Sequence, residues 1–156
     1  MNATINLENK HFPVLLNELI SIISPLYGGT FIDCTFGQGG YSEKILENKQ
    51  NNIIALDRDK DVLSNTLKLQ KKYNKRFKFY NLKFSQLDQI KLKKHEIKGI
   101  IFDLGYSLNQ IKNSQKGLSF SDKGKLDMRM GINDFSANEI ISNMDESNLT
   151  KVFKVF

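Results

Sequence analysis

Cysteine and proline are scarce in this sequence, and tryptophan is absent. The 156 residues include one cysteine and two prolines. The single cysteine, Cys34, excludes an internal disulfide and a multi-cysteine zinc site, and its position inside a predicted strand indicates a small core residue without a catalytic role. No apolar run approaches the ~18 residues that span a bilayer, and residues 1–6 lack the features of a secretory signal. We therefore expect a cytoplasmic protein with no membrane partner.

The overall composition is that of an ordinary globular protein with a basic surface. Hydrophobic residues make up 40% of the chain and charged residues 26%. The length suits about one domain, although it is short for a Rossmann-like enzyme with a separate substrate region. The net charge of +6 comes mainly from lysine, much of it between residues 68 and 98. This charge favours a nucleic-acid partner, but a solvated lysine-rich face explains it equally well.

Residues 28–42 form a stretch in which an apolar run ends in a small-residue loop and a helix begins. Thr30 to Cys34 has the β-branched and aromatic content of a buried strand, and we predict a helix from Tyr41 to Leu46. Between them lie three residues that permit positive φ and close backbone approach to a ligand, Gly37, Gly39 and Gly40. Such a loop is typical of a ligand site, although a tight turn that packs helix against sheet gives the same pattern.

An acidic residue, Asp57, closes the next apolar run and lies 24 positions after Asp33. In a βαβ unit, an acidic residue about 20 positions past the glycine turn ends the second strand, where it binds the hydroxyls of a ribose. The glycine spacing departs from G-x-G-x-x-G, because Gly40 follows Gly39 directly. The pair therefore indicates an adenosine-containing cofactor, and S-adenosylmethionine is favoured over NAD.

The rest of the first 105 residues continues the alternation of strands and helices. The patterns predict helices over 14–24, 58–72 and 84–90, and strands over 76–81 and 99–105. Three strands then terminate at Asp33, Asp57 and Asp103. In open α/β sheets, ligands bind beyond the carboxyl ends of the strands at the switch point, which implies the strand order 3-2-1-4. Phe84 either belongs to the core or lies on a purine ring, and the position of His11 favours a capping or surface role.

The character of the chain changes near residue 105. Residues 106–156 are polar and rich in loop-forming residues, and we expect them to form short helices that do not extend the sheet. Ser136 and Glu139 form a capping box at the start of one helix, and Asp145 caps another. We therefore predict two domains, 1–105 and 106–156.

The motifs of this chain, taken together, resemble those of a known family. These are His11-x-Pro-Val-Leu-Leu-x-Glu18, Asp33-x-Thr-x-Gly-x-Gly-Gly40, Asp57-Arg-Asp59, Phe102-Asp-Leu-Gly105, Gly117-Leu-Ser-Phe120 and Leu126-Asp-Met-Arg-Met130. They resemble, in the same order, the signatures of the S-adenosylmethionine-dependent methyltransferases that modify the N4 amine of a cytosine in 16S ribosomal RNA. The family's members are much longer. The resemblance thus implies an N-terminal portion of a Rossmann-like methyltransferase core, truncated within a helical substrate-recognition insert.

The resemblance also implies roles for particular residues. The cofactor contacts would fall on Gly39, Gly40, Tyr41, Asp57, Phe84, Asp103 and Gln110, with Asp57 on the ribose and Phe84 beside the adenine. Asp103 would orient the cofactor or the acceptor amine as a catalytic residue. The family commonly has histidine where this chain has Tyr41 and serine where it has Leu108. The resemblance implies no metal. A metal site at Asp57-Arg-Asp59 is the weaker interpretation of this motif, since these positions serve a ribose and a helix start.

The expected function is methylation of the N4 amine of a cytosine in 16S rRNA of the small ribosomal subunit. A truncated remnant that binds cofactor or RNA without catalysis is the alternative. A nicotinamide-dependent oxidoreductase fits the βαβ unit, but it leaves Leu126 to Met130 unexplained.

Overall fold

The computed structural model describes residues 13–23, 27–121 and 123–155. The chain divides into two compact units, Met1–Leu104 and Gly105–Phe156. We describe each unit by itself. His11, the last residue of the helix predicted over 14–24 and residues 1–6 lie outside the described residues.

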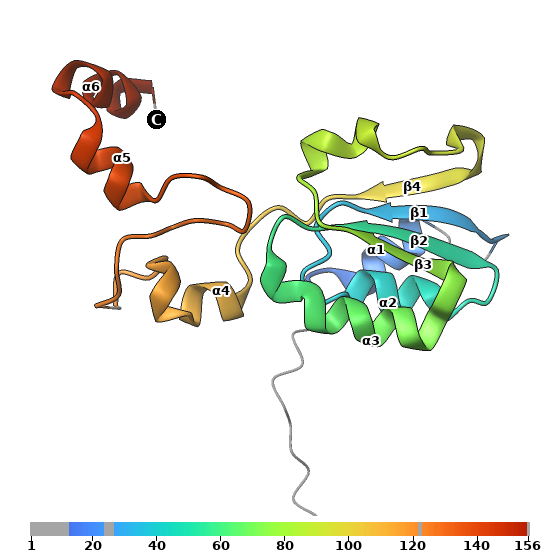
Figure 1. The fold of residues 1–156 in the computed structure, drawn as a ribbon. Helices are drawn as coiled ribbons and strands as arrows, with labels where there is room; N and C mark the ends of the chain where they lie inside the picture. The colour runs from blue at the N-terminus through green and yellow to red at the C-terminus, as the bar shows by residue number, and fades with distance from the viewer. Residues whose placement is uncertain (1–12, 24–26, 122, 156) are drawn as a thin grey trace, which may run out of the picture. The chain divides into compact units, whose positions relative to one another are not determined.

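The first unit contains a four-stranded sheet. Its strands are β1 (Gly29–Asp33), β2 (Asn51–Leu56), β3 (Phe77–Tyr80) and β4 (Ile97–Ile101). All pairings are parallel and the order is β3-β2-β1-β4 (Figure 1). This order confirms the predicted α/β, Rossmann-like architecture. The strand predicted over 99–105 is wrong at both ends. β4 begins earlier, at Ile97, which pairs with Thr30, and it ends at Ile101, which lies opposite Asp33, the last residue of β1.

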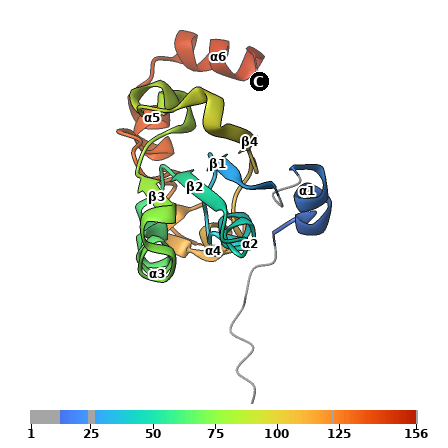
Figure 2. The ribbon, with the colours of Figure 1, turned by 90° about the vertical axis from the view of Figure 1, so that its right-hand side faces the viewer.

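Three helices cover one face of this sheet (Figures 1 and 2). They are α1 (Leu16–Ile23), α2 (Gly40–Leu46) and α3 (Leu63–Tyr73), and 3-10 turns lie at Lys60–Val62 and Asn74–Arg76 on either side of α3. Alternate strand residues meet the apolar faces of these helices. The core between them includes Phe31, Ile45, Leu46, Ile53, Ala55, Leu69 and Phe77.

The other face is covered by the connection between β3 and β4 (Figure 1). This connection contains 3-10 turns at Phe84–Gln89 and Lys94–Glu96, so the helix predicted over 84–90 has the tighter 3-10 form. Ile32, Cys34, Leu56 and Ile90 form the buried cluster beneath it. Cys34 is 3% exposed, and burial raises the pKa of its thiol to about 11. The prediction of a core cysteine is confirmed.

The second unit contains helices and no strand among its described residues, 105–121 and 123–155. The helices are α4 (Leu108–Lys112), α5 (Ala137–Asn143) and α6 (Glu146–Val155), with a 3-10 turn at Ser114–Lys116. The predicted capping box is confirmed, since the Ser136 hydroxyl accepts the Glu139 N–H and the Glu139 carboxylate accepts the Ser136 N–H. Asp145 accepts the N–H of Asn148 at 2.9 Å, which confirms its capping role.

Candidate functional site

Three carboxylates follow adjacent strands at the carboxyl edge of the sheet. Asp33 is the last residue of β1, Asp57 directly follows β2, and Asp103 lies just past β4. Because these strands are parallel neighbours, their carboxyl ends meet at one edge. The negative charges of Asp57 and Asp103 contribute to raising the pKa of Asp33, as expected for side chains that lie close together.

Asp33 fastens the glycine loop from inside the protein. Its side chain is fully buried. Its carboxylate accepts the Ser42 hydroxyl at 2.7 Å and the Thr35 N–H at 3.2 Å. Burial is the main cause that raises its pKa to about 6. Asp33 therefore holds β1, the loop and α2 together through Ser42 and Thr35. The N-cap residue of α2 is Gly39.

Asp57 joins the glycine loop to the turn after β2. One carboxylate oxygen accepts the Gly37 N–H at 2.7 Å, and the other accepts the Asp59 N–H at 2.8 Å. Burial is the main cause that raises the pKa of Asp57 above its ordinary value. A carboxylate oxygen accepts more than one hydrogen bond, so both oxygens keep acceptor capacity. This fixed, partly exposed carboxylate fits the hydroxyls of a ribose.

Packing within the protein explains two of the loop glycines. Gly39 has φ +81, and a Cβ there would lie 2.7 Å from the Phe36 ring. A Cβ on Gly40 would overlap Pro13, which packs against the loop just before α1. At Gly37, by contrast, a Cβ would meet nothing closer than 3.8 Å. Phe36 and Pro13 therefore pack against the loop at Gly39 and Gly40, and the loop is open at Gly37.

Tyr41 uses its side chain inside the fold. It is 6% exposed, and its hydroxyl donates to the Val14 carbonyl at 2.5 Å. Burial is the main cause that raises the pKa of Tyr41 to about 12, and the negative charge of Asp103 contributes. Of the predicted cofactor contact at Tyr41, only the backbone remains available.

Asp103 is exposed, and its backbone is anchored to the loop after β1. Its N–H donates to the Thr35 hydroxyl oxygen at 2.7 Å. A similar bond links β2 and β3, where the Asn81 side-chain amide donates to the Asp57 carbonyl at 2.8 Å. Neither Thr35 nor Asn81 emerged from the sequence as a positioning residue. Thr35 is part of the Asp33-x-Thr-x-Gly motif, whereas the signal for Asn81 was only a polar side chain at the carboxyl end of a strand.

Phe84 lies beside Phe102 rather than in the core. It is 44% exposed, which removes the interpretation as an ordinary core residue. The two rings meet edge to face, with centroids 5.6 Å apart and an interplanar angle of 87°. The contact with Phe102 orients Phe84 and leaves part of it exposed.

Gln110 lies in the second unit, which is described by itself. It forms a capping box with Ser107 at the start of α4. The Gln110 N–H donates to the Ser107 hydroxyl at 3.2 Å, and its side-chain oxygen accepts the Ser107 N–H at 2.9 Å. The contact of Gln110 with a cofactor stays a prediction.

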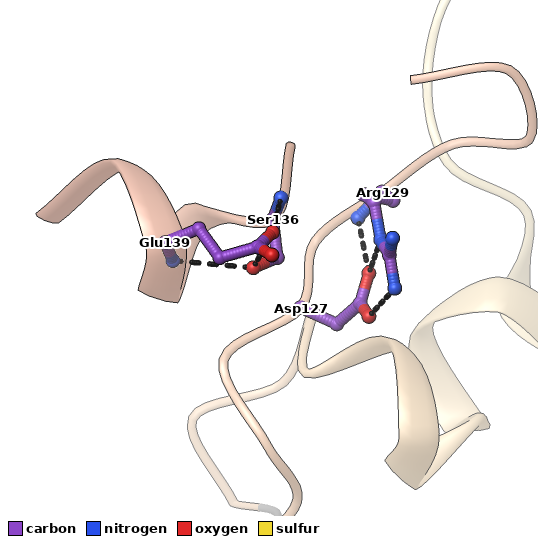
Figure 3. Close-up of polar contacts among 4 residues, drawn as sticks. All are labelled: Asp127, Arg129, Ser136 and Glu139. Atoms are coloured by element: carbon purple, nitrogen blue, oxygen red, sulfur yellow. Dashed lines mark hydrogen bonds and ion pairs between the residues drawn. The ribbon is translucent and has the colours of Figure 1, made fainter. Parts of the chain in front are cut away.

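The Leu126–Met130 motif forms a turn closed by an ion pair (Figure 3). The Arg129 guanidinium donates from Nε and Nη2 to the two carboxylate oxygens of Asp127, at 2.9 and 2.7 Å. The Arg129 N–H also donates to this carboxylate, at 3.0 Å. These hydrogen bonds lower the pKa of Asp127 to about 2 and raise that of Arg129. The bidentate geometry orients the guanidinium, which has further donors.

The same motif supports the start of α5. The carbonyls of Asp127 and Leu126 accept the N–H groups of Ala137 and Asn138, at 2.8 and 2.9 Å. The Ser136 hydroxyl accepts the next N–H, that of Glu139, at 3.2 Å. The first helical N–H groups, which have no partner within a helix, are thus satisfied. The motif therefore has a structural role in addition to any role in binding.

Neither a membrane-spanning helix nor a metal cluster is found in the described part of the chain. No helix there is long and apolar enough to cross a membrane. No group of three or more His, Cys, Asp or Glu side chains within residues 13–23, 27–121 and 123–155 could hold a metal ion.

The parallel sheet, the glycine loop and the acidic strand ends define a Rossmann-like ligand-binding fold. Residues 8–156 match the model of the MraW methylase family, and the chain belongs to this family. A solved Escherichia coli protein, yhhF, overlaps 51% of this chain and 46% of its own with a TM-score of 0.42 and 15% identity, an overlap too small to define the fold.

Two curated relatives carry the name ribosomal RNA small subunit methyltransferase H. That of Rickettsia massiliae is 41% identical over 92% of this chain and 46% of its own length. That of Orientia tsutsugamushi (strain Boryong) is 37% identical over 96% of this chain and 48% of its own length. The chain spans about half the length of these relatives.

Proposed function

We propose that this chain supplies the cofactor-binding half of an S-adenosylmethionine-dependent enzyme that methylates the N4 amine of a cytosine in 16S rRNA. The observation that carries this proposal is the Asp57 carboxylate, held at the end of β2 against the Gly37 N–H at 2.7 Å. Membership of the MraW methylase family supports it. The names of the relatives support small-subunit ribosomal RNA as the partner. The cell compartment would then be the cytoplasm.

In the first unit, the residues around the carboxyl edge of the sheet would bind the cofactor. Asp57 would accept hydrogen bonds from the ribose hydroxyls, and the exposed face of Phe84 would lie against the adenine. The glycine loop, with Gly39, Gly40 and the backbone of Tyr41, would lie along the amino-acid part. When bound, S-adenosylmethionine supplies a methyl group activated by a sulfonium.

Asp103 would position the acceptor amine. Its backbone is fixed by Thr35, and its side chain is exposed at the same edge as Asp57. The N4 amine of cytosine is a poor nucleophile, because its lone pair is conjugated into the ring, so alignment at near-attack distance contributes much of the rate. A base edge becomes accessible when the base is unstacked, as in single-stranded RNA.

A cofactor- or RNA-binding chain without catalysis is the second candidate. The observation that favours it is the coverage of 46–48% of the relatives' length. The four described strands also leave β4 with a partner on one side only. A pocket that is open on one side admits water and holds an amine less firmly.

Transfer of labelled methyl groups from S-adenosylmethionine to unmodified small ribosomal subunits tests both candidates. We expect incorporation as N4-methylcytosine by this chain extended to the length of its relatives, and none by residues 1–156 alone. Asp103→Asn in the extended protein should reduce the rate by roughly 10²-fold or more, while the exposed control Asp88→Asn should not. Labelling of another atom by the extended protein would contradict the proposal. Full activity of residues 1–156 would remove the second candidate.

A further inference from the structure

A basic depression opens at the amino edge of the sheet, at the opposite end from the carboxyl edge with Asp33, Asp57 and Asp103. It has a volume of about 280 Å³, and its lining includes the strand starts Thr30, Asn52 and Ile97. Five basic residues and one acidic residue line it: Lys75, Arg76, Lys78, Lys91, Lys93 and Glu96. At ~3.3 Å per residue, the three residue steps along β1 from Thr30 to Asp33 separate this depression from Asp33 by roughly 10 Å. It is thus a different surface from the candidate site.

The alternation of side chains along the strands explains why the depression is open. Phe77 and Ile53 point to the helix-covered face and are buried there, so Lys78 and Asn52 point to the opposite face. On that face, the apolar cluster of Ile32, Cys34, Leu56 and Ile90 lies toward the carboxyl end. Polar and basic side chains occupy the amino end, where the connection between β3 and β4 leaves them exposed.

Two of the five cations are used within the fold. Arg76 donates from Nη1 to the carbonyls of Leu46, Asn48 and Asn51, at 3.1, 3.0 and 3.1 Å. Lys93 pairs with Glu96 at 3.1 Å.

The other three basic residues, Lys75, Lys78 and Lys91, are exposed, and their side-chain ammonium groups form no hydrogen bond or ion pair with any described residue. The one acidic residue in the lining, Glu96, is paired with Lys93. The three remaining charges therefore repel one another, which costs free energy unless an anion neutralises them.

We propose that this basic depression binds phosphates of the RNA backbone, as a second contact distant from the cofactor edge; this inference rests on the proposed function. Compact ammonium groups on flexible side chains suit phosphate oxygens. The lining contains no aromatic side chain on which a base could stack. The depression would therefore position RNA without reading its sequence.

A pair of double variants tests this proposal on residues 1–156. Lys75→Ala/Lys78→Ala removes two charges from the depression. Lys68→Ala/Lys71→Ala removes two exposed charges with the same spacing from α3, on the other face. Binding of in vitro transcribed 16S rRNA is measured between 50 and 200 mM salt, and S-adenosylhomocysteine binding and circular dichroism are measured on the same samples.

The depression variant should bind RNA roughly tenfold more weakly, and its salt dependence should fall by about 1 to 2 in log–log slope, since each phosphate contact contributes ~0.7–0.9. The α3 variant should keep both values, and adding Lys91→Ala to the depression variant should weaken binding further. Equal losses in the two double variants would overturn the proposal, because they would show a general charge effect. Undetectable RNA binding by a chain that binds S-adenosylhomocysteine would also overturn it, while leaving the cofactor part of the proposed function intact.

Discussion

At the scale of single residues, the acidic edge contains three aspartates in three different environments. Asp33 is buried and serves the fold, Asp57 is bonded to the loop on one side, and Asp103 is exposed. The sequence pattern does not distinguish them, since each is predicted to end a strand. Only the structure separates the group that carries a buried charge from the two that can meet a ligand, because burial depends on what packs above each strand.

Asp33 should leave a signature in the pH dependence of stability. Its pKa of about 6 in the folded protein lies above the ordinary 3.8. The native state therefore holds this proton where the unfolded state has lost it, and Asp33's contribution to stability falls as the pH rises from about 4 to 6. Asp33→Asn removes this titration.

Urea unfolding of both proteins from pH 4 to pH 8 measures the effect. The stability of Asp33→Asn relative to the natural sequence should rise by up to about 3 kcal/mol over this range, at ~1.4 kcal/mol per pH unit. Lost hydrogen bonds to Ser42 and Thr35 give a constant offset. The exposed control Asp88→Asn should show little pH-dependent difference. A difference between Asp33→Asn and the natural protein that does not vary with pH would show that Asp33 is not titrating as a buried group.

At the scale of elements, local signals predicted most of the fold. The strand order β3-β2-β1-β4 was predicted from the alternating strand and helix patterns. The capping box of α5 and the cap of α6 were predicted from local sequence. What sequence could not predict are bonds between distant segments. The Asp103 N–H bonds to Thr35 across 68 positions, and Pro13 lies against Gly40. These contacts depend on the completed packing of the sheet and helices.

The capping box of α5 gives an element-scale prediction. Ser136→Ala removes the acceptor of the Glu139 N–H, so we expect a loss of roughly 0.5–2 kcal/mol of local stability. Hydrogen exchange at the Glu139 amide should become faster by a matching factor. Ser142→Ala, at an exposed position in the same helix, is the control and should leave this amide protected. Unchanged exchange in Ser136→Ala would mean that the carbonyls of the Leu126–Met130 motif suffice to hold the helix start.

At the scale of the whole molecule, the residues proposed for function are distributed over both units. The first unit carries the carboxyl edge with Asp57, Asp103 and Phe84, and the second carries the Leu126–Met130 motif and Gln110. The MraW methylase family model covers both. The chain nevertheless spans about half the length of its curated relatives. Cofactor binding by the first unit is therefore the part of the proposed function that residues 1–156 can test directly.

Calorimetric titration of residues 1–156 with S-adenosylhomocysteine and with NAD is the most direct test of this account. We predict tighter binding of S-adenosylhomocysteine. Asp57→Ala should weaken it by the ~1.5–3 kcal/mol typical of hydrogen bonds to a charged group, and the exposed control Asp88→Ala should not. Binding of NAD with no response to S-adenosylhomocysteine, or full affinity for S-adenosylhomocysteine in Asp57→Ala, would contradict the assignment of this edge as the cofactor site.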